Sequence, residues 1–148
     1  MQLSWSRADG AIVLSGDIDE KCAFDALLDD VKDGTVLDLS RVERINSVGV
    51  RLWLGFIQAI EAKGCALTMR GCSVAVVQQL NIIARFAGAA RITSIHAPFL
   101  CPQCDTSATK VVTLEGDIEP QLHHACPNCK TPMEFDDIPQ AYFAFRRR

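Results

Sequence analysis

The first 97 residues contain no proline, because all six prolines of this 148-residue chain lie between Pro98 and Pro139. Such an uneven distribution indicates a change of architecture along the chain. We place the boundary in the sequence HAPF, residues 96–99, which predicts one domain over residues 1–97 and a second over residues 98–148. A chain of this length has room for one small domain with an appendage.

Long apolar runs are also missing. The longest, residues 48–60, is interrupted by Arg51 and Gln58 and is too short to cross a bilayer. No apolar stretch of signal-peptide length follows Met1. We therefore expect a cytoplasmic protein with no membrane span, in which the seven cysteines are reduced thiols and not a secreted disulfide framework.

The chain has no excess of positive charge, since its formal net charge is −3. Residues 99–148 carry five basic and seven acidic side chains, so the phosphates of nucleic acids would be repelled. The terminal sequence FRRR, residues 145–148, is basic but short. Nucleic-acid binding therefore remains only an alternative to the protein-binding role argued below.

Signatures of catalysis are absent too. No G-x-S-x-G elbow or phosphate-binding loop occurs, and all three histidines lie at or beyond the predicted domain boundary. The sequence offers no set of nucleophile, base and orienting group, so we expect a protein that is not an enzyme.

The residues that are present alternate between strand and helix signals over the first domain. Strands are predicted at 3–8, 11–16, 35–40, 65–70 and 91–95, and helices at 22–31, 47–63 and 74–87. Asp9-Gly10 predicts a hairpin between the first two strands. This α/β order predicts a mixed sheet with helices packed on one face.

The helix predicted at 47–63 begins in the sequence RINSVGVRLWLGF, residues 44–56. At about 100° per residue its apolar residues fall on one side, which predicts a core face of Trp53, Phe56, Ile57 and Ile60. The opposite side carries Ser47, Arg51, Gly55 and Gln58. Ser47 therefore has two interpretations. It is the N-cap of the helix, or it is a phosphorylation switch, because the positive end of a helix accommodates a phosphoryl group.

Four segments follow one another in an order typical of a known family. They are GDID after the second strand, the strand VLDLS leading into INSVGV, a helix ending at Lys63-Gly64, and the helix VAVVQQLNIIARFAG before a final strand. Together they resemble the STAS domain of bacterial anti-anti-sigma factors. The resemblance implies a STAS-like mixed sheet and a partner that is an anti-sigma factor and kinase. It also implies phosphorylation at Ser47 and partner binding through Asn46, Ser47, Val48, Gly49 and Arg51.

The sequence departs from the family pattern, D-S-S-G, at two positions. Asn46 replaces the acidic residue and Val48 replaces a second polar residue. Other STAS domains belong to signalling or lipid-transport assemblies. A constitutive scaffold subunit, in which Ser47 is only a helix cap, is therefore the alternative function.

Four cysteines dominate the second domain. CPQC at 101–104 and CPNC at 126–129 are separated by 21 residues, and four thiolates suit Zn²⁺ in a tetrahedron. We predict a structural zinc ribbon that serves for docking, with the metal held by Cys101, Cys104, Cys126 and Cys129. Iron, two disulfides or four free thiols are the alternatives. The aromatic run AYFAF, residues 141–145, is predicted to pack back on the protein.

Overall fold

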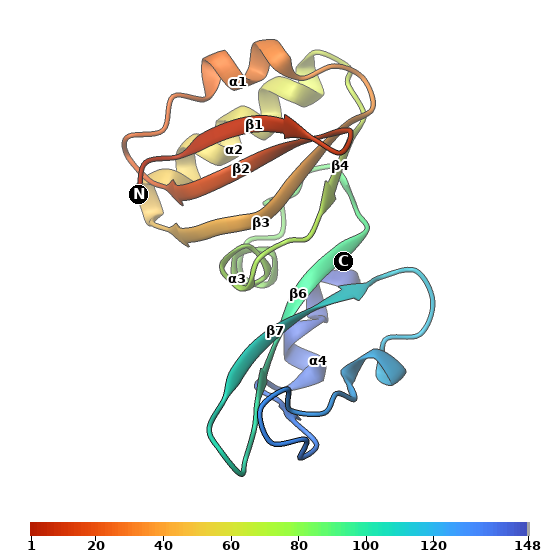
Figure 1. The fold of residues 1–148 in the computed structure, drawn as a ribbon. Helices are drawn as coiled ribbons and strands as arrows, with labels where there is room; N and C mark the ends of the chain where they lie inside the picture. The colour runs from red at the N-terminus through yellow and green to blue at the C-terminus, as the bar shows by residue number, and fades with distance from the viewer. Residues whose placement is uncertain (148) are drawn as a thin grey trace.

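The structure is a computed structural model in which residues 1–147 are described, so Arg148 of the predicted basic tail lies outside the described residues. Two sheets follow one another along the chain, and helix α3 lies between them (Figure 1). Among the described residues, no helix has the length and apolar content that crossing a membrane requires.

The first sheet has five strands in the order β1-β2-β3-β4-β5. Their bounds are β1 (Ser4–Ala8), β2 (Ala11–Ile18), β3 (Thr35–Ile45), β4 (Leu67–Arg70) and β5 (Arg91–Ile92). β1 and β2 are antiparallel around the predicted Asp9-Gly10 turn, where both residues have positive φ. The other neighbours are parallel, which confirms the predicted mixed sheet.

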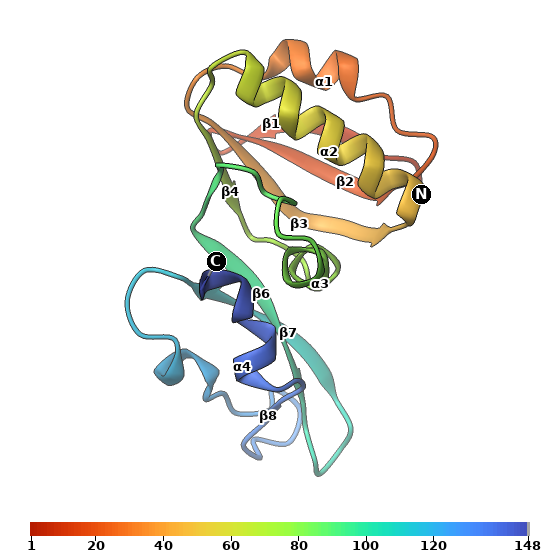
Figure 2. The ribbon, with the colours of Figure 1, turned by 180° about the vertical axis from the view of Figure 1, so that it is seen from behind.

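Three helices accompany this sheet: α1 (Phe24–Asp30), α2 (Ser47–Ala62) and α3 (Val74–Ile82). α1 and α2 lie together on one face, as Figures 1 and 2 show from opposite sides. The predicted core face of α2 is confirmed, because Trp53, Phe56, Ile57 and Ile60 are all buried. α3 contacts β3 and also β6 of the second sheet, so it packs against both parts of the chain.

The third helix ends earlier than the sequence predicts. It was expected to reach residue 87, but Ile83 is already extended and the chain continues as a loop. Tertiary packing explains the difference, because Phe86 is fully buried and its ring stacks on Trp53. The Trp53 indole N–H donates to the Phe86 carbonyl oxygen at 2.8 Å. Burial of this ring outweighs the helical preference of the local sequence.

The second sheet is smaller and has the order β7-β6-β8. Its strands are β6 (Ser94–Leu100), β7 (Ser107–Thr113) and β8 (Glu134–Phe135), accompanied by η1 (Glu119–Leu122), α4 (Pro139–Tyr142) and η2 (Ala144–Arg147). The strand predicted at 91–95 is divided between β5 and β6. Residues 96–99, where the sequence places a domain boundary, lie within β6, and the chain passes between the sheets at Thr93.

The aromatic run near the end of the chain packs back on the protein, as predicted. Tyr142 and Phe143 are buried, and their rings contact each other and Phe135 of β8. This cluster belongs to the same continuous core as the residues of the first sheet.

Candidate functional site

The amino-terminal end of α2 lies where β2 and β3 end side by side. Asn46, and not Ser47, is the N-cap of this helix. Its side-chain oxygen accepts the backbone N–H of Gly49 at 2.7 Å, and its own backbone N–H donates to the Ile18 carbonyl at 3.1 Å. The interpretation of Ser47 as a cap is therefore wrong. Asparagine and serine cap helices about equally well, so the sequence alone did not separate the two.

Gly49 needs a correction as well. The resemblance placed it on the partner-binding surface, but it is buried. A Cβ atom at this position would lie 2.0 Å from the Ile18 carbonyl oxygen. Gly49 therefore allows α2 to start directly against the end of β2, and it contributes to the surface only by positioning its neighbours.

The other four predicted contact residues are at the surface. Asn46, Ser47, Val48 and Arg51 are exposed, and Leu52 joins them although the sequence analysis did not select it. Val48 and Leu52 are 39% and 36% exposed and occupy successive turns of one helix face. We call these five residues the α2 amino-terminal surface. It presents two apolar side chains, one cation and one hydroxyl.

A groove continues this surface between α1 and α2. It has a volume of about 310 Å³ and is lined by Arg51, Leu52 and Gly55 of α2 and by residues around Cys22 and Leu28. A Cβ atom at Gly55 would meet nothing within 4 Å, so the groove is open there. The groove shares Arg51 and Leu52 with the α2 amino-terminal surface, so the two are continuous.

Glu20 supplies a negative charge beside Asn46, which stands where the family pattern named above has aspartate. The Asn46 Nδ2 atom donates to Glu20 Oε2 at 2.8 Å. This hydrogen bond is the main reason why the pKa of Glu20 lies below its usual value. An aspartate at position 46 would place two carboxylates side by side, so asparagine fits the glutamate of this chain.

The four cysteines of the second domain come together at one point. Their sulfur atoms all lie within 4.8 Å of one another, with Cys101 and Cys129 at 3.5 Å and Cys104 and Cys126 at 3.6 Å. Sulfurs at the corners of a tetrahedron with bonds of 2.3 Å are separated by about 3.8 Å. The arrangement therefore fits a single metal ion, and these sulfurs are too far apart for disulfide bonds.

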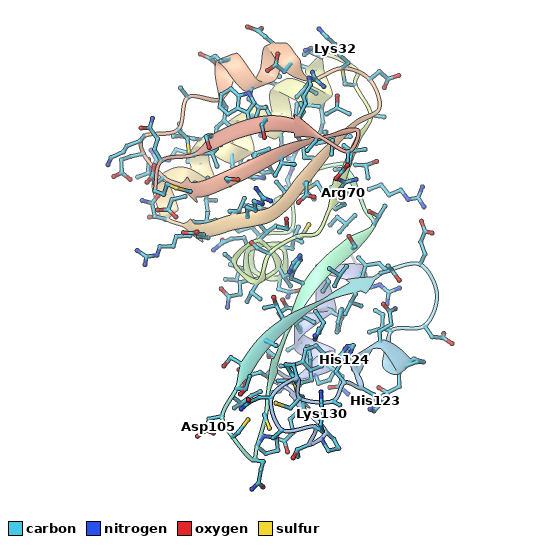
Figure 3. All side chains as sticks on the ribbon, in the orientation of Figure 1. Lys32, Arg70, Asp105, His123, His124 and Lys130 are labelled. Carbon is cyan, nitrogen blue, oxygen red and sulfur yellow. The ribbon has the colours of Figure 1, made fainter. Side chains whose placement is uncertain are left out.

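The two C-P-x-C turns that carry the cysteines have the same backbone geometry. The N–H of Asp105 donates to the Cys101 carbonyl, and the N–H of Lys130 to the Cys126 carbonyl, at 3.0 and 2.9 Å. Asp105 and Lys130 have φ of 60° and 67°, which is the left-handed region. Figure 3 shows both residues at the same end of the second domain, beside the sulfur atoms.

The surroundings of Cys104 favour its thiolate, whereas burial raises the pKa of Cys101 to about 11. The Cys104 sulfur lies 3.0 Å from the Thr106 hydroxyl, and this contact is the first of several that lower the pKa of Cys104 to about 6. The Asn128 side chain adds an N–H at 3.6 Å. In the corresponding position of the second turn, the Cys129 thiol donates to the Thr131 hydroxyl oxygen at 3.3 Å. Because metal ligands must be deprotonated, the lowered pKa prepares Cys104 for a cation.

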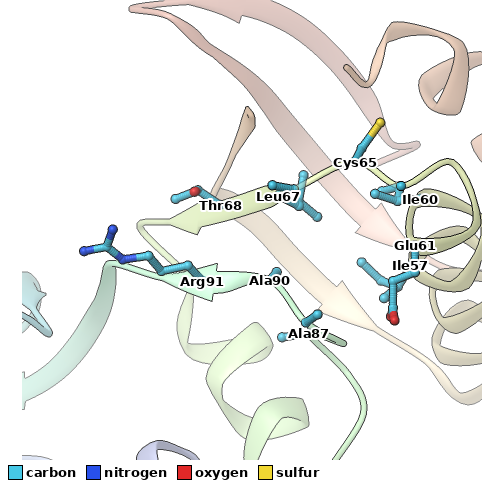
Figure 4. Close-up of a pocket in the computed structure, with 12 residues that line it drawn as sticks. Ile57, Ile60, Glu61, Cys65, Leu67, Thr68, Ala87, Ala90 and Arg91 are labelled. Carbon is cyan, nitrogen blue, oxygen red and sulfur yellow. The ribbon is translucent and has the colours of Figure 1, made fainter. Parts of the chain in front are cut away.

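A cavity of about 610 Å³ lies at the opposite end of α2 (Figure 4). Ile57, Ile60 and Leu67 form its apolar wall, and Glu61 and Arg91 stand at separate sides of it. The Arg91 guanidinium pairs with Glu115 of the second domain. Because α2 rises about 1.5 Å per residue, this cavity is roughly 20 Å from Ser47 and is separate from the α2 amino-terminal surface.

Comparison with known proteins agrees with the fold of the first sheet. A family model described as the Mlab STAS domain matches residues 1–93. The intermembrane phospholipid transport system binding protein MlaB of Escherichia coli strain K12 is 34% identical over 76 residues, which cover 47% of this chain and 74% of that protein. The protein of the same name from Shigella flexneri matches to the same extent. The family match ends at residue 93, before the four cysteines.

Proposed function

We propose that this chain is a protein-binding subunit of a larger assembly and has no catalytic activity of its own. The proposal starts from its family, because the chain belongs to the Mlab STAS domain family. The relatives at 34% identity are named as binding proteins of a phospholipid transport system. A scaffold role in an assembly of that kind is therefore our first candidate function.

The observation that carries this proposal is the α2 amino-terminal surface. Two apolar side chains, Val48 and Leu52, are exposed on the same helix as Arg51. Arg51 and Leu52 also line the groove. Exposed apolar residues bordered by polar ones are typical of protein contact sites, and arginine is enriched in them. A partner would bury Val48 and Leu52 and would pair an acidic group with Arg51.

A switch at Ser47 is the second candidate function, and the exposure of this residue favours it. Ser47 is the first residue of α2, its side chain is not needed for capping, and it is exposed. A phosphoryl group there would find the free N–H groups of the first turn while adding charge to the contact surface. An anti-sigma factor that is also a kinase would be such a partner.

Two substitutions separate the scaffold from the switch. If the protein is a constitutive scaffold, Ser47→Ala and wild type bind the partner equally, and the protein from its native cells carries no phosphate on Ser47. If Ser47 is a switch, Ser47→Asp loses the partner, Ser47→Ala keeps it, and mass spectrometry finds phosphoserine at position 47. Gln58→Asp, an exposed residue of the same helix, serves as the charge control.

We propose further that the four cysteines hold a structural Zn²⁺ and that residues 98–148 form a zinc ribbon for docking. The sulfur geometry and the Thr106 hydroxyl beside Cys104 support a metal centre. Four thiolates complete a tetrahedral shell and leave no position for substrate, which is typical of a structural site. Elemental analysis of the purified protein tests this proposal. One zinc per chain is expected, one iron would reassign the metal, and no metal would refute the centre.

A further inference from the structure

The last described residues of the chain are bound to α3 in the way a separate peptide would be. The Asn81 side chain holds them at two points, because its Nδ2 atom donates to the Tyr142 carbonyl at 2.9 Å and its Oδ1 atom accepts the N–H of Phe145 at 2.8 Å. The Tyr142 hydroxyl donates to the His96 carbonyl at 2.6 Å. We call residues 139–147 the C-terminal segment.

Packing of this segment is tight on one side and loose on the other. Tyr142 and Phe143 are 3% and 8% exposed and lie against Phe135 of β8. Beside Phe145, by contrast, a cavity of about 270 Å³ remains between its ring and the loop after α3. The segment is therefore joined to α3 by the Asn81 hydrogen bonds and is anchored on its other side by the rings that pack on β8. Tyr142 and Phe143 belong to the continuous core, whereas Phe145 is only packed against its edge.

The position of β8 depends in turn on the cysteine turns. β6 leads directly into Cys101, and Cys129 precedes β8 by five residues. β8 itself pairs with β6 through only two residues, Phe135 opposite Phe99 and Glu134 opposite Leu100, and one further bond joins Asp136 to the Pro98 carbonyl. So short a pairing is weak by itself. Figure 2 shows α4 beside β6, and α4 also contacts α3. A metal that joined the two turns would fix β8 and, with it, the C-terminal segment.

We infer that metal binding at the four cysteines acts as a clasp that keeps the C-terminal segment on α3, an inference that rests on the metal centre proposed above. When the metal is lost, the segment leaves α3. The Asn81 amide, the His96 carbonyl and the Tyr142 and Phe143 rings then lose the contacts described above. The metal state of the second domain would thereby control a surface of the first.

Hydrogen–deuterium exchange of the full-length protein tests the clasp. After metal content has been measured, the metal is removed with a chelator under reducing conditions and is then restored with Zn²⁺. Removal is expected to accelerate amide exchange by roughly tenfold or more in residues 139–146 and in the last turn of α3, while β2 and β3 remain slow. Zn²⁺ is expected to restore slow exchange.

Two variants make this test specific. Asn81→Ala is expected to give fast exchange in residues 139–146 while the protein still binds one metal per chain. Gln78→Ala, at an exposed position of the same helix, is expected to leave exchange unchanged. If residues 139–146 stay slow after metal removal while residues 101–133 become fast, the clasp is refuted and the metal centre stands. A protein that takes up no metal refutes both.

Discussion

Asn46 holds the amino-terminal end of α2 by two hydrogen bonds, one to Gly49 and one to Glu20. Asn46→Ala should therefore lower the free energy of unfolding by about 1 kcal/mol, as is usual for a lost N-cap. Ser47→Ala should change it by less than about 0.5 kcal/mol, because Ser47 is exposed and is not the cap. Urea denaturation of both variants checks this order, and a larger loss for Ser47→Ala would contradict it.

The hydrogen bond from the Asn46 amide to Glu20 determines how the Glu20 carboxyl responds to pH. The pKa of Glu20 is lowered in the folded protein, chiefly by the Asn46 amide, so this interaction stabilises the fold when the carboxyl is ionised. Its contribution is present above the ordinary value of 4.5 and disappears as the pH falls below it. An NMR titration of Glu20 should show a pKa closer to 4.5 in Asn46→Ala than in wild type. Equal values would show that the amide is not the cause.

Asp105 and Lys130 have left-handed backbone conformations, which residues other than glycine adopt at a cost. Asp105→Gly and Lys130→Gly should leave metal binding unchanged and should raise the free energy of unfolding by up to about 1 kcal/mol. Ser107→Gly, at an exposed position of β7, is the matched control and should lower it by about 0.5–1 kcal/mol. Thermal unfolding of the three metal-loaded variants measures these changes in stability. A loss of stability in Asp105→Gly and Lys130→Gly would show that the left-handed backbone at these positions is not strained.

At the scale of elements, two glycines of α2 should respond in opposite ways to the same substitution. Gly49→Ala should destabilise the protein by about 3 kcal/mol or more, because its Cβ would collide with the Ile18 carbonyl and force α2 away from β2. Gly55→Ala should stabilise it by about 1 kcal/mol, because the position is exposed and alanine favours the helix. Similar effects at both positions, measured by urea denaturation, would contradict the close approach at Gly49.

Periodicity and turn signals predicted the elements whose own sequence decides their structure. The core face of α2, the Asp9-Gly10 hairpin and the mixed order of the sheet are of this kind. The early end of α3 was not predictable from a local pattern, because it depends on Phe86 reaching Trp53 across 33 residues of sequence. The burial of Gly49 depends in the same way on Ile18, which lies in another element. Among site residues, Leu52 was missed because helical periodicity placed it on neither face.

At the scale of the whole molecule, charge distinguishes protein binding from nucleic-acid binding. The chain has a formal net charge of −3, and the second domain would carry four thiolates around its metal. We expect no binding of DNA or RNA even at low salt, where phosphate contacts are strongest. A salt-dependent shift in an electrophoretic mobility assay with the full-length, metal-loaded protein would contradict this expectation and would reassign the function of the second domain.

The account depends above all on the α2 amino-terminal surface as the place where a partner binds, and site-specific photocrosslinking in native cells measures this directly. A photoreactive amino acid at Val48 should give a covalent adduct with a single partner protein. The same group at Ser6, exposed on β1 at the edge of the first sheet, should give none. Adducts at Ser6 together with their absence at Val48 would contradict the account.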